Sequence, residues 1–429
     1  MKKLFLLLLV CASTFVDAQS AKILKLIDNV EPNVIAWRRD FHEHPELSNR
    51  EFRTSKIIAD YLKSLGLEVK TGVAHTGVIG ILKGGKPGPV VALRADIDAL
   101  PVTERVDLPF ESKLTSTYNG IKTGVMHACG HDTHIAMMMG TATVLTKIKK
   151  DLKGTVKFIF QPAEEGAPKG EEGGAELMVK EGALKNPDVD VIFGMHIHSG
   201  LHVGYITYKP GGTMAAAQRF EIHVHGKQSH GSRPWAGIDP IVISAQIING
   251  LQVIISREMD LTKEGAVITV GMIKSGIRNN IIPEEATLIG TIRTLDYGMQ
   301  KKLNALMKKR VVEIAKSYGA TADITIDKGL PITYNDPALT AEMLPSLQKA
   351  VAKGHLKLIK AITGAEDFSF FQKEVPGLYF FVGGTPLNVA EKDAPAHHTP
   401  DFYIDESGMK TGVKAMVNLT IDYMNQHAK

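Results

Sequence analysis

One short segment, from Met126 to His134, combines a thiol with several imidazoles. Cys129 and His131 are two residues apart, and in an extended backbone both side chains would point to the same side. Thiolate and imidazole are preferred ligands of zinc-like ions. The other cysteine of the chain, Cys11, lies in a predicted export signal, so a disulfide is excluded as the purpose of Cys129. This spacing therefore indicates a metal site.

Three further segments supply candidate ligands. Glu164 and Glu165 follow an apolar run at residues 156–160. Adjacent carboxylates at a strand end face different ways, so one can bind metal while the other reaches the attacking water. His196 ends a second apolar run, and His398 lies near the C-terminus. All these segments end a strand or open a helix, and α/β sheets bind ligands at the carboxyl ends of their strands.

The elements that must position these residues alternate along the first half of the chain. Short apolar runs of the buried-strand type lie at residues 90–93, 156–160 and 189–195. A capping box at Ser48–Glu51 predicts a helix that runs to about residue 65. A second helix is expected at about 133–149, with Asp132 as its cap. Strands interleaved with helices predict an α/β layer with a largely parallel sheet.

Residues 215–328 follow a different order. Strands are expected at about 220–224, 266–273, 286–294 and 322–326, with helices at 240–257 and 303–318. The order β-α-β-β-α-β is typical of a ferredoxin-like unit. We therefore predict that residues 215–328 form a small satellite domain, inserted into a catalytic domain made of residues 19–214 and 329–429.

Composition and the N-terminus limit the function classes. The formal net charge is only +4 and no dense run of lysine and arginine occurs, so no nucleic-acid partner is expected. Lys2 and Lys3, the apolar stretch that ends at Val16 and the small residue Ala18 predict a cleaved signal peptide at 1–18. The protein is then expected to be secreted or periplasmic. No later stretch is expected to be apolar enough to cross a bilayer, so no membrane partner is expected after cleavage.

The chain resembles the metallo-amidohydrolases that include hippurate hydrolase, N-acyl-L-amino-acid amidohydrolases and auxin-conjugate hydrolases. They are relatives of aminoacylase and the co-catalytic zinc exopeptidases. The stretches that carry the resemblance span nearly the whole mature chain: 41–47, 94–101, 127–134, 161–166, 194–196, 226–240, 280–283, 364–368 and 398–400. The resemblance implies a two-domain metallopeptidase-like fold, with a mixed, largely parallel sheet in the catalytic domain and an inserted ferredoxin-like α+β satellite domain.

The resemblance also implies roles in the catalytic domain. Two divalent metal ions per subunit, zinc or manganese with cobalt or nickel as alternatives, would be bound by Cys129, His131, Glu165, His196 and His398. The Cys129 thiolate would bridge them. Glu164 would be the general base. His134 and His397 are expected to support the site without binding metal.

Residues of the satellite domain are implied to reach the substrate. His230 matches a histidine that helps to hold the tetrahedral intermediate, often from the neighbouring subunit of a homodimer formed through this domain. Asn280 and Arg293 are candidates for binding the substrate carboxylate. In that case the domains must close over the substrate during turnover. Trp235 departs from the pattern, since several relatives have a histidine there.

The expected reaction is metal-dependent hydrolysis of the amide of N-acyl or aryl-acyl amino acids, which releases a carboxylic acid and a free amino acid. The alternative is a secreted exopeptidase or dipeptidase with the same two-metal centre. A thiol hydrolase built on Cys129 would not need paired carboxylates and three further ligand segments. A binding protein without catalysis would be expected to have lost Glu164 or Glu165.

Overall fold

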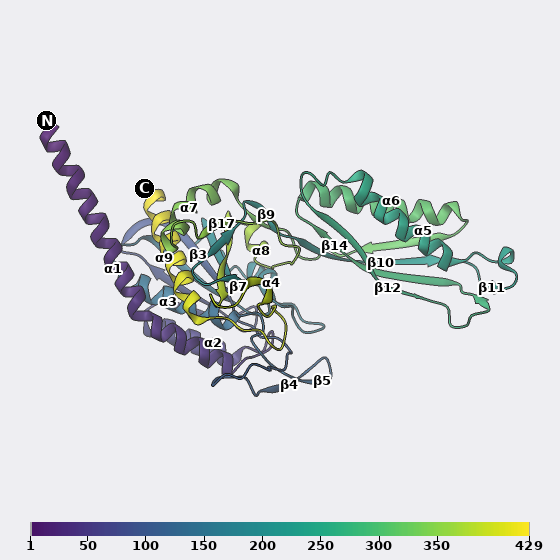
Figure 1. The fold of residues 1–429 in the computed structure, drawn as a ribbon, viewed down its shortest axis with the longest axis horizontal. Coiled ribbons are helices and arrows are strands. Elements are labelled where there is room, and N and C mark those ends of the chain that lie inside the picture. The colour runs from purple at the N-terminus through teal and green to yellow at the C-terminus, as the bar shows by residue number, and fades with distance from the viewer. Residues whose placement is uncertain (1, 429) are drawn as a thin grey trace. The chain divides into compact units, whose positions relative to one another are not determined.

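The computed structural model describes residues 2–428, with side chains from residue 21 onward, and divides the chain into two compact units (Figure 1). The first comprises Met1–Pro210, Asn335–Ile359 and Phe370–Lys429, and the second comprises Gly211–Tyr334 and Lys360–Ser369. The inserted domain predicted at 215–328 lies inside the second unit, and its proposed boundaries stay a prediction. Residue 1 and the side chains of residues 2–20, which include most of the predicted signal peptide, lie outside the described part.

An eight-stranded mixed sheet forms the centre of the first unit, in the order β1-β2-β6-β3-β7-β18-β8-β17. The strands are β1 Glu68–Val73, β2 Gly77–Lys83, β3 Lys86–Asp96, β6 Lys153–Gln161, β7 Val191–His202, β8 Ile206–Tyr208, β17 Leu356–Leu358 and β18 Gly377–Thr385. The central strands β6, β3, β7 and β18 are parallel to their neighbours in that group, whereas β1 and β2 run antiparallel. The prediction of a mixed, largely parallel sheet is confirmed.

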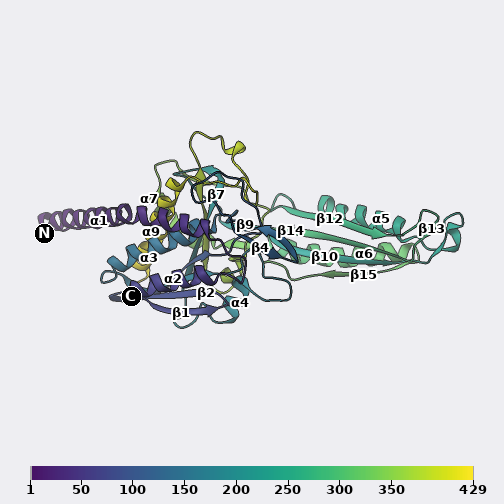
Figure 2. The ribbon, with the colours of Figure 1, turned by 90° about the horizontal axis from the view of Figure 1, so that it is seen from below.

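Helices cover this sheet because its central strands are apolar on both faces. Every residue of β18 is buried, as is the second half of β3. The helices are α1 Lys2–Glu43, α2 Phe52–Ser64, α3 His131–Lys147, α4 Gly174–Lys180, α7 Pro337–Ala350 and α9 Met409–His427. Helices α1, α3 and α9 pack on one another and share one core with β3 and β6 (Figure 2).

The start of α2 differs from the predicted capping box. The helix begins at Phe52, and the Ser48 hydroxyl donates to the Asp98 carboxylate at 2.8 Å. The carboxylate of Glu46 accepts hydrogen bonds from the N–H groups of Arg53 and Thr54 in the first turn of the helix, at 3.0 and 2.8 Å. Glu51 is instead fully buried. The capping box is therefore wrong, because Ser48 and Glu51 bind groups elsewhere in the fold.

The start of α3 also differs from the prediction. Gly130 precedes the helix with a left-handed backbone (φ 93°), and His131 is the first helical residue. Asp132 thus lies inside the first helical turn and does not cap it. Its carboxylate pairs with cationic side chains of α1 instead.

The second unit is a four-stranded antiparallel sheet with two helices on one face (Figures 1 and 2). Its strands lie in the order β12-β14-β10-β15. The elements are β10 Ala216–His225, α5 Pro240–Val253, β12 Ala266–Ser275, β14 Glu285–Thr294, α6 Tyr297–Ser317 and β15 Thr321–Ile326. This is the predicted β-α-β-β-α-β order of a ferredoxin-like unit.

Short elements complete the chain. They are β4 Thr115–Tyr118, β5 Ile121–Gly124, β9 Gly211–Met214, β11 Ser229–His230, β13 Ile281–Ile282, β16 Thr333–Asn335 and α8 Ser369–Gln372.

The expectation that no later stretch is apolar enough to cross a bilayer is wrong by length and composition. Residues Pro240–Glu258, which form α5 and the π turn after it, are long and apolar enough to cross a bilayer. One face of this helix packs on the sheet of the second unit through Ile243, Ile247 and Leu251. Part of the apolar surface of this helix is therefore buried in the core of the second unit, whereas Ile241 and Val242 are exposed.

Candidate metal centre

The turn that carries Cys129 depends on Gly130. The backbone there is a tight turn, and the expectation of an extended segment is wrong. Gly130 has a φ of 93°, a region that favours glycine. A Cβ atom at this position would also lie 2.4 Å from a side-chain methyl of Ile197. The turn can therefore approach β7 closely and still start α3 at His131.

The five predicted ligands lie close together around the Cys129 thiol. Its Sγ is 3.4 Å from Nε2 of His196 and 3.2 Å from Nε2 of His398. The same nitrogen of His398 is 3.1 Å from Oε1 of Glu165, which in turn is 3.9 Å from Nε2 of His131. His398 has a left-handed backbone (φ 64°), a strained conformation that proteins retain mainly at functional sites.

The histidine rings present Nε2 to this cluster. His131 donates through Nδ1 to the backbone carbonyl of Asp98 at 2.9 Å, and its buried Nε2 has no hydrogen-bond partner among the described residues. His196 likewise donates through Nδ1 to a backbone carbonyl, that of Ile197, at 2.5 Å. A neutral ring that donates through one nitrogen holds a lone pair on the other, the arrangement that metal-binding histidines adopt, so His131 would bind a metal once its second proton has left.

Two other histidines near the cluster use both ring nitrogens. His134 accepts an N–H of β7 at Nε2 (2.8 Å), and its Nδ1 lies 2.5 Å from Asp96. His397 accepts another N–H of β7 at Nε2 (3.1 Å) and donates through Nδ1 to the carbonyl of Cys129 (3.2 Å). In this geometry His134 has no lone pair left for a metal and braces the site. Nδ1 of His397 also lies 3.7 Å from Sγ of Cys129, and His397 forms with Cys129 and His196 a group close enough together to hold a metal ion.

A strained turn presents the paired glutamates. Ala163 has a left-handed backbone (φ 51°), and its N–H donates to Oε1 of Glu51 at 2.9 Å. The Asp98 carboxylate accepts the N–H groups of Glu164 and Glu165, both at 3.1 Å. Oε2 of Glu164 lies 4.0 Å from Nε2 of His131. Glu164 is thus held beside the ligand cluster by its backbone.

The charges around the cluster suit a divalent cation. Burial and the carboxylates of Glu165 and Glu164 raise the pKa of the Cys129 thiol well above its usual value. Burial would lower the pKa of His131, but Asp96 and Asp98 outweigh it and raise that pKa to about 10. The protein groups alone therefore leave an excess of negative charge. A bound dication would supply the missing charge and deprotonate the thiol, so this set of ligands fits a metal.

The satellite residues are only partly brought together within the second unit. His230 on β11 pairs with Ile281 on β13, its ring is exposed, and the N–H of the next residue donates to the Asn280 carbonyl at 2.8 Å. Arg293 lies near the far end of β14, which begins at Glu285. At about 3.3 Å per residue, Arg293 lies roughly 26 Å along β14 from Glu285, the end of the strand that is close to Asn280 in the chain. His230 and Asn280 are therefore neighbours, and Arg293 is not near them within one chain.

Three supporting residues were not identified from the sequence. Asp98 fixes both His131 and the backbone of the paired glutamates, Asp96 holds His134, and Glu51 holds Ala163. Asp96 and Asp98 were visible as two acidic residues directly after an apolar strand, at the spacing that puts both on one side. Glu51 carried no comparable signal.

Comparison with known proteins identifies the family. Residues 92–422 match the model of peptidase family M20/M25/M40. The chain is 41% identical to thermostable carboxypeptidase 2 of Saccharolobus solfataricus, over 94% of this chain and 99% of that protein. It is 40% identical to an N-acyl-L-amino acid amidohydrolase of Geobacillus stearothermophilus, over 72% of this chain and 79% of that one.

A solved structure gives the same result for the fold. The Bacillus subtilis YXEP protein, described as a dinuclear metal-binding peptidase from the M20 family, matches with a TM-score of 0.77 and 36% identity, over 93% of this chain and 99% of that one. The predicted resemblance and fold class are confirmed. The chain is a hydrolase that belongs to peptidase family M20/M25/M40.

Proposed function

We propose that this protein hydrolyses the amide bond of N-acyl or aryl-acyl amino acids with two divalent metal ions. The ions would be held by Cys129, as the bridge, with His131, Glu165, His196 and His398. The observation that carries the proposal is the convergence of these five side chains, with Nε2 of His131 unpaired among the described residues and Glu164 beside it.

The residues around this cluster divide the chemistry. When bound, divalent metal ions polarise an amide carbonyl and lower the pKa of water. Glu164 is proposed to take a proton from the attacking water on its carboxylate and to pass it to the departing amine. Asp98 keeps that carboxylate in position through the backbone N–H of Glu164. His230 and Asn280 are proposed to contact the substrate from the satellite domain.

Zinc is the metal that the thiolate and imidazole ligands favour. Manganese, cobalt and nickel remain alternatives, because selection among such ions follows availability as well as affinity.

The names of the relatives support two substrate classes. One relative is an N-acyl-L-amino acid amidohydrolase and another is a carboxypeptidase. Both activities break an amide whose nitrogen belongs to an amino acid. We therefore propose N-acyl amino acids as the substrate class, with exopeptidase or dipeptidase activity at the same centre as the second candidate.

A homodimer through the satellite domain is also proposed. β12 is an edge strand of the four-stranded sheet, and edge strands offer unpaired backbone groups. Val267, Met272 and Ile273 on this strand are exposed, as are Ile241 and Val242 on α5. Exposed apolar groups beside a sheet edge favour association. Light scattering should give a dimer mass for the wild type and a monomer mass for Ile273→Lys.

Export is proposed from the N-terminal sequence. Lys2 and Lys3 followed by an apolar stretch support cleavage after residue 18 and a secreted or periplasmic protein. Sequencing the N-terminus of the protein from fractionated cells should find Gln19 as the first residue. Recovery of the intact N-terminus would contradict cleavage.

The activity is tested by amino-acid release from a panel of N-acetyl, N-benzoyl and indole-acyl amino acids and simple dipeptides, with and without a chelator. Chelator-sensitive release from acyl amino acids is the expected result. Release chiefly from dipeptides would favour the exopeptidase alternative. Release that is indifferent to thorough metal removal would overturn the metal centre.

A further inference from the structure

We propose that α1, which supplies no ligand, fixes the metal-binding turn through a buried charge cluster of four side chains. The cluster consists of Arg38 and His42 from α1, Glu104 from the segment after β3, and Asp132 from the first turn of α3. Arg38, His42 and Glu104 are then positioning residues for metal binding. This inference rests on the proposed metal centre, because Asp132 directly follows the predicted ligand His131.

The cluster is closely connected and inaccessible to solvent. Nε of Arg38 lies 2.8 Å from Oδ2 of Asp132, and Nδ1 of His42 lies 2.9 Å from the same oxygen. Nε2 of His42 lies 3.0 Å from Oε1 of Glu104. All four side chains are at most 1% exposed. Buried charges persist only where each has partners, so the cluster has one favoured arrangement.

The two carboxylates determine the charge of His42. Each accepts a hydrogen bond from a different ring nitrogen, so the ring donates on both sides and is an imidazolium. Burial and Arg38 lower the pKa of His42, but the bonds to Asp132 and Glu104 outweigh them and raise it. Two positive side chains therefore balance two negative ones. Glu104 is fixed in turn by the N–H of Ser112 at 2.7 Å.

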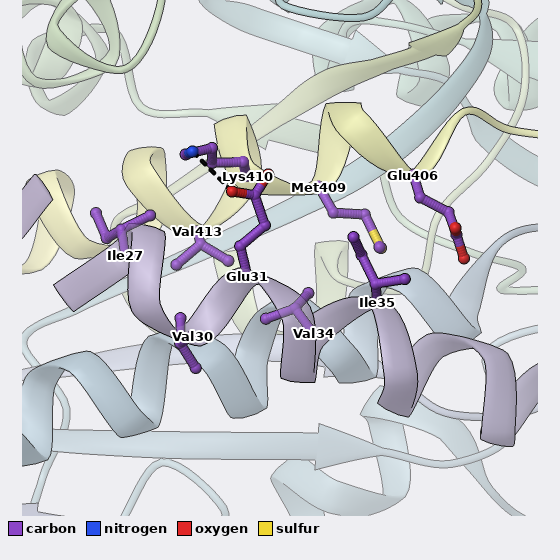
Figure 3. A pocket seen from close by; sticks show the side chains of 9 residues that line it. All are labelled: Ile27, Val30, Glu31, Val34, Ile35, Glu406, Met409, Lys410 and Val413. Carbon is purple, nitrogen blue, oxygen red and sulfur yellow. Dashed lines mark hydrogen bonds and ion pairs between the residues drawn. The ribbon is translucent and has the colours of Figure 1, made fainter. Parts of the chain in front are cut away.

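Helix α1 is a firm base for this cluster because residues 27–35, just before Arg38, are docked on α9. Figure 3 shows apolar side chains of both helices facing one another around a small pocket. They are Ile27, Val30, Val34 and Ile35 of α1 with Met409 and Val413 of α9. Lys410 adds ion pairs to Asp28 (2.8 Å) and Glu31 (2.7 Å). One turn after Ile35, Arg38 also reaches Glu406 at 3.4 Å.

The same helix lies close against α3. A Cβ atom on Gly140 of α3 would lie 2.6 Å from a methyl of Val34. The side chain of Val34 therefore packs directly on the backbone of α3 at this glycine. Asp132 directly follows His131 and is three residues after Cys129 in the chain. A displacement of Asp132 would therefore move both predicted ligands. Supporting residues of this kind commonly change metal affinity by about 10- to 100-fold.

A matched pair of substitutions at His42 separates the two bonds. In His42→Asn the amide nitrogen falls near the place of Nδ1 and can still donate to Asp132. In His42→Gln it falls near the place of Nε2 and can reach Glu104 only. We expect His42→Gln to weaken Zn²⁺ binding by about 10-fold or more, and His42→Asn to stay within about threefold of the wild type. Binding would be measured on the full chain by competition with a chromophoric chelator.

A control variant distinguishes positioning from general loss of stability. Lys410→Met removes two ion pairs that dock α1 but touches none of the four cluster residues. It is expected to lower the melting temperature of the metal-free protein and to leave Zn²⁺ affinity unchanged. Equal Zn²⁺ affinity in His42→Gln and the wild type would overturn the inference, as would equal weakening by Lys410→Met. If His42→Gln does not fold, Arg38→Met, which removes the other cationic partner of Asp132, is expected to weaken Zn²⁺ binding to a similar extent, and wild-type affinity in that variant would overturn the inference.

Different results would overturn the proposed function and this inference. Wild-type protein that binds no Zn²⁺ and hydrolyses no acyl amino acid would overturn the metal centre and this inference with it. Wild-type protein that binds Zn²⁺ while both His42 variants match it would overturn this inference alone.

Discussion

Replacement of Glu51 by alanine should damage both stability and catalysis, although Glu51 does not touch the ligand cluster. Its two carboxyl oxygens bond the N–H of Ala163 at 2.9 Å and the hydroxyl of Thr76 at 2.6 Å. Both bonds are buried. Glu51→Ala removes both, and Ala163 is the residue that precedes the paired glutamates.

The magnitude follows from these two bonds and from the backbone of Ala163. A buried polar group that loses its partner costs about 1–3 kcal/mol, so two such groups predict a loss of about 3 kcal/mol in the free energy of unfolding. A left-handed alanine costs about 1–2 kcal/mol, which is comparable to the bond that is lost. Without that bond the turn is expected to relax, and a displacement of about 1 Å at Glu164 lowers kcat by roughly 100-fold.

The control is Glu51→Gln, whose carbonyl oxygen can accept from Ala163 while its amide donates to Thr76. At about pH 5, where Glu51 keeps its proton in the folded chain, Glu51→Gln should stay within about 1 kcal/mol of the wild type, and it should remain active. Urea unfolding at about pH 5 and kcat at neutral pH and saturating N-acyl amino acid, with Zn²⁺ present, measure both effects. Wild-type kcat in Glu51→Ala would refute the reasoning, as would equal damage from both substitutions.

Three other predictions concern the same unit. Burial and Asp98 raise the pKa of Glu51 from 4.5 to about 8. Between pH 4.5 and about pH 8, the Glu51 carboxyl is therefore ionised in the unfolded chain but keeps its proton in the folded chain. Stability due to Glu51 therefore falls as the pH rises through this window, and the melting temperature of Glu51→Gln relative to the wild type should increase from about pH 5 to about pH 8 by calorimetry. Lys157→Met leaves three backbone carbonyls without their donor, at 3.2, 2.7 and 3.0 Å, and should cost about 3 kcal/mol in urea unfolding; no loss would contradict this. Ala163→Gly relieves a left-handed alanine and should raise the free energy of unfolding by about 0.5 kcal/mol, whereas a loss above about 1 kcal/mol would show that Ala163 is not strained.

The candidate metal ligands could be predicted from the sequence because most of them lie near the ends of strands or the start of a helix. Glu164 and Glu165 follow β6 after a short turn. His196 was predicted at a strand end but lies within β7, which continues to His202 and is two strands away from β6 in the same sheet. Parallel strands bring their carboxyl ends to one edge, so segments far apart in the chain meet there. The ferredoxin-like order of the second unit was also predictable, because hydrophobic residues repeat with one spacing in strands and with another in helices.

The supporting residues could not be predicted because their partners are distant in the sequence. Ser48 and Glu51 match a local capping box, yet their partners are Asp98, Thr76 and Ala163. Asp132 looks like a helix cap, but two cations of α1 are its partners. A local pattern describes which bonds a side chain can make, and the tertiary fold decides which of them it makes.

In the proposed metal centre, five side chains hold two metal ions beside Glu164. The most direct measurement is the metal content and activity of Glu164→Gln compared with the wild type, both loaded with Zn²⁺. Two equivalents of Zn²⁺ in each protein, with hydrolysis of N-acyl amino acids at least about 100-fold slower in Glu164→Gln, is the predicted result. Full activity of Glu164→Gln with metal bound, or a wild type that retains no metal, would contradict the account.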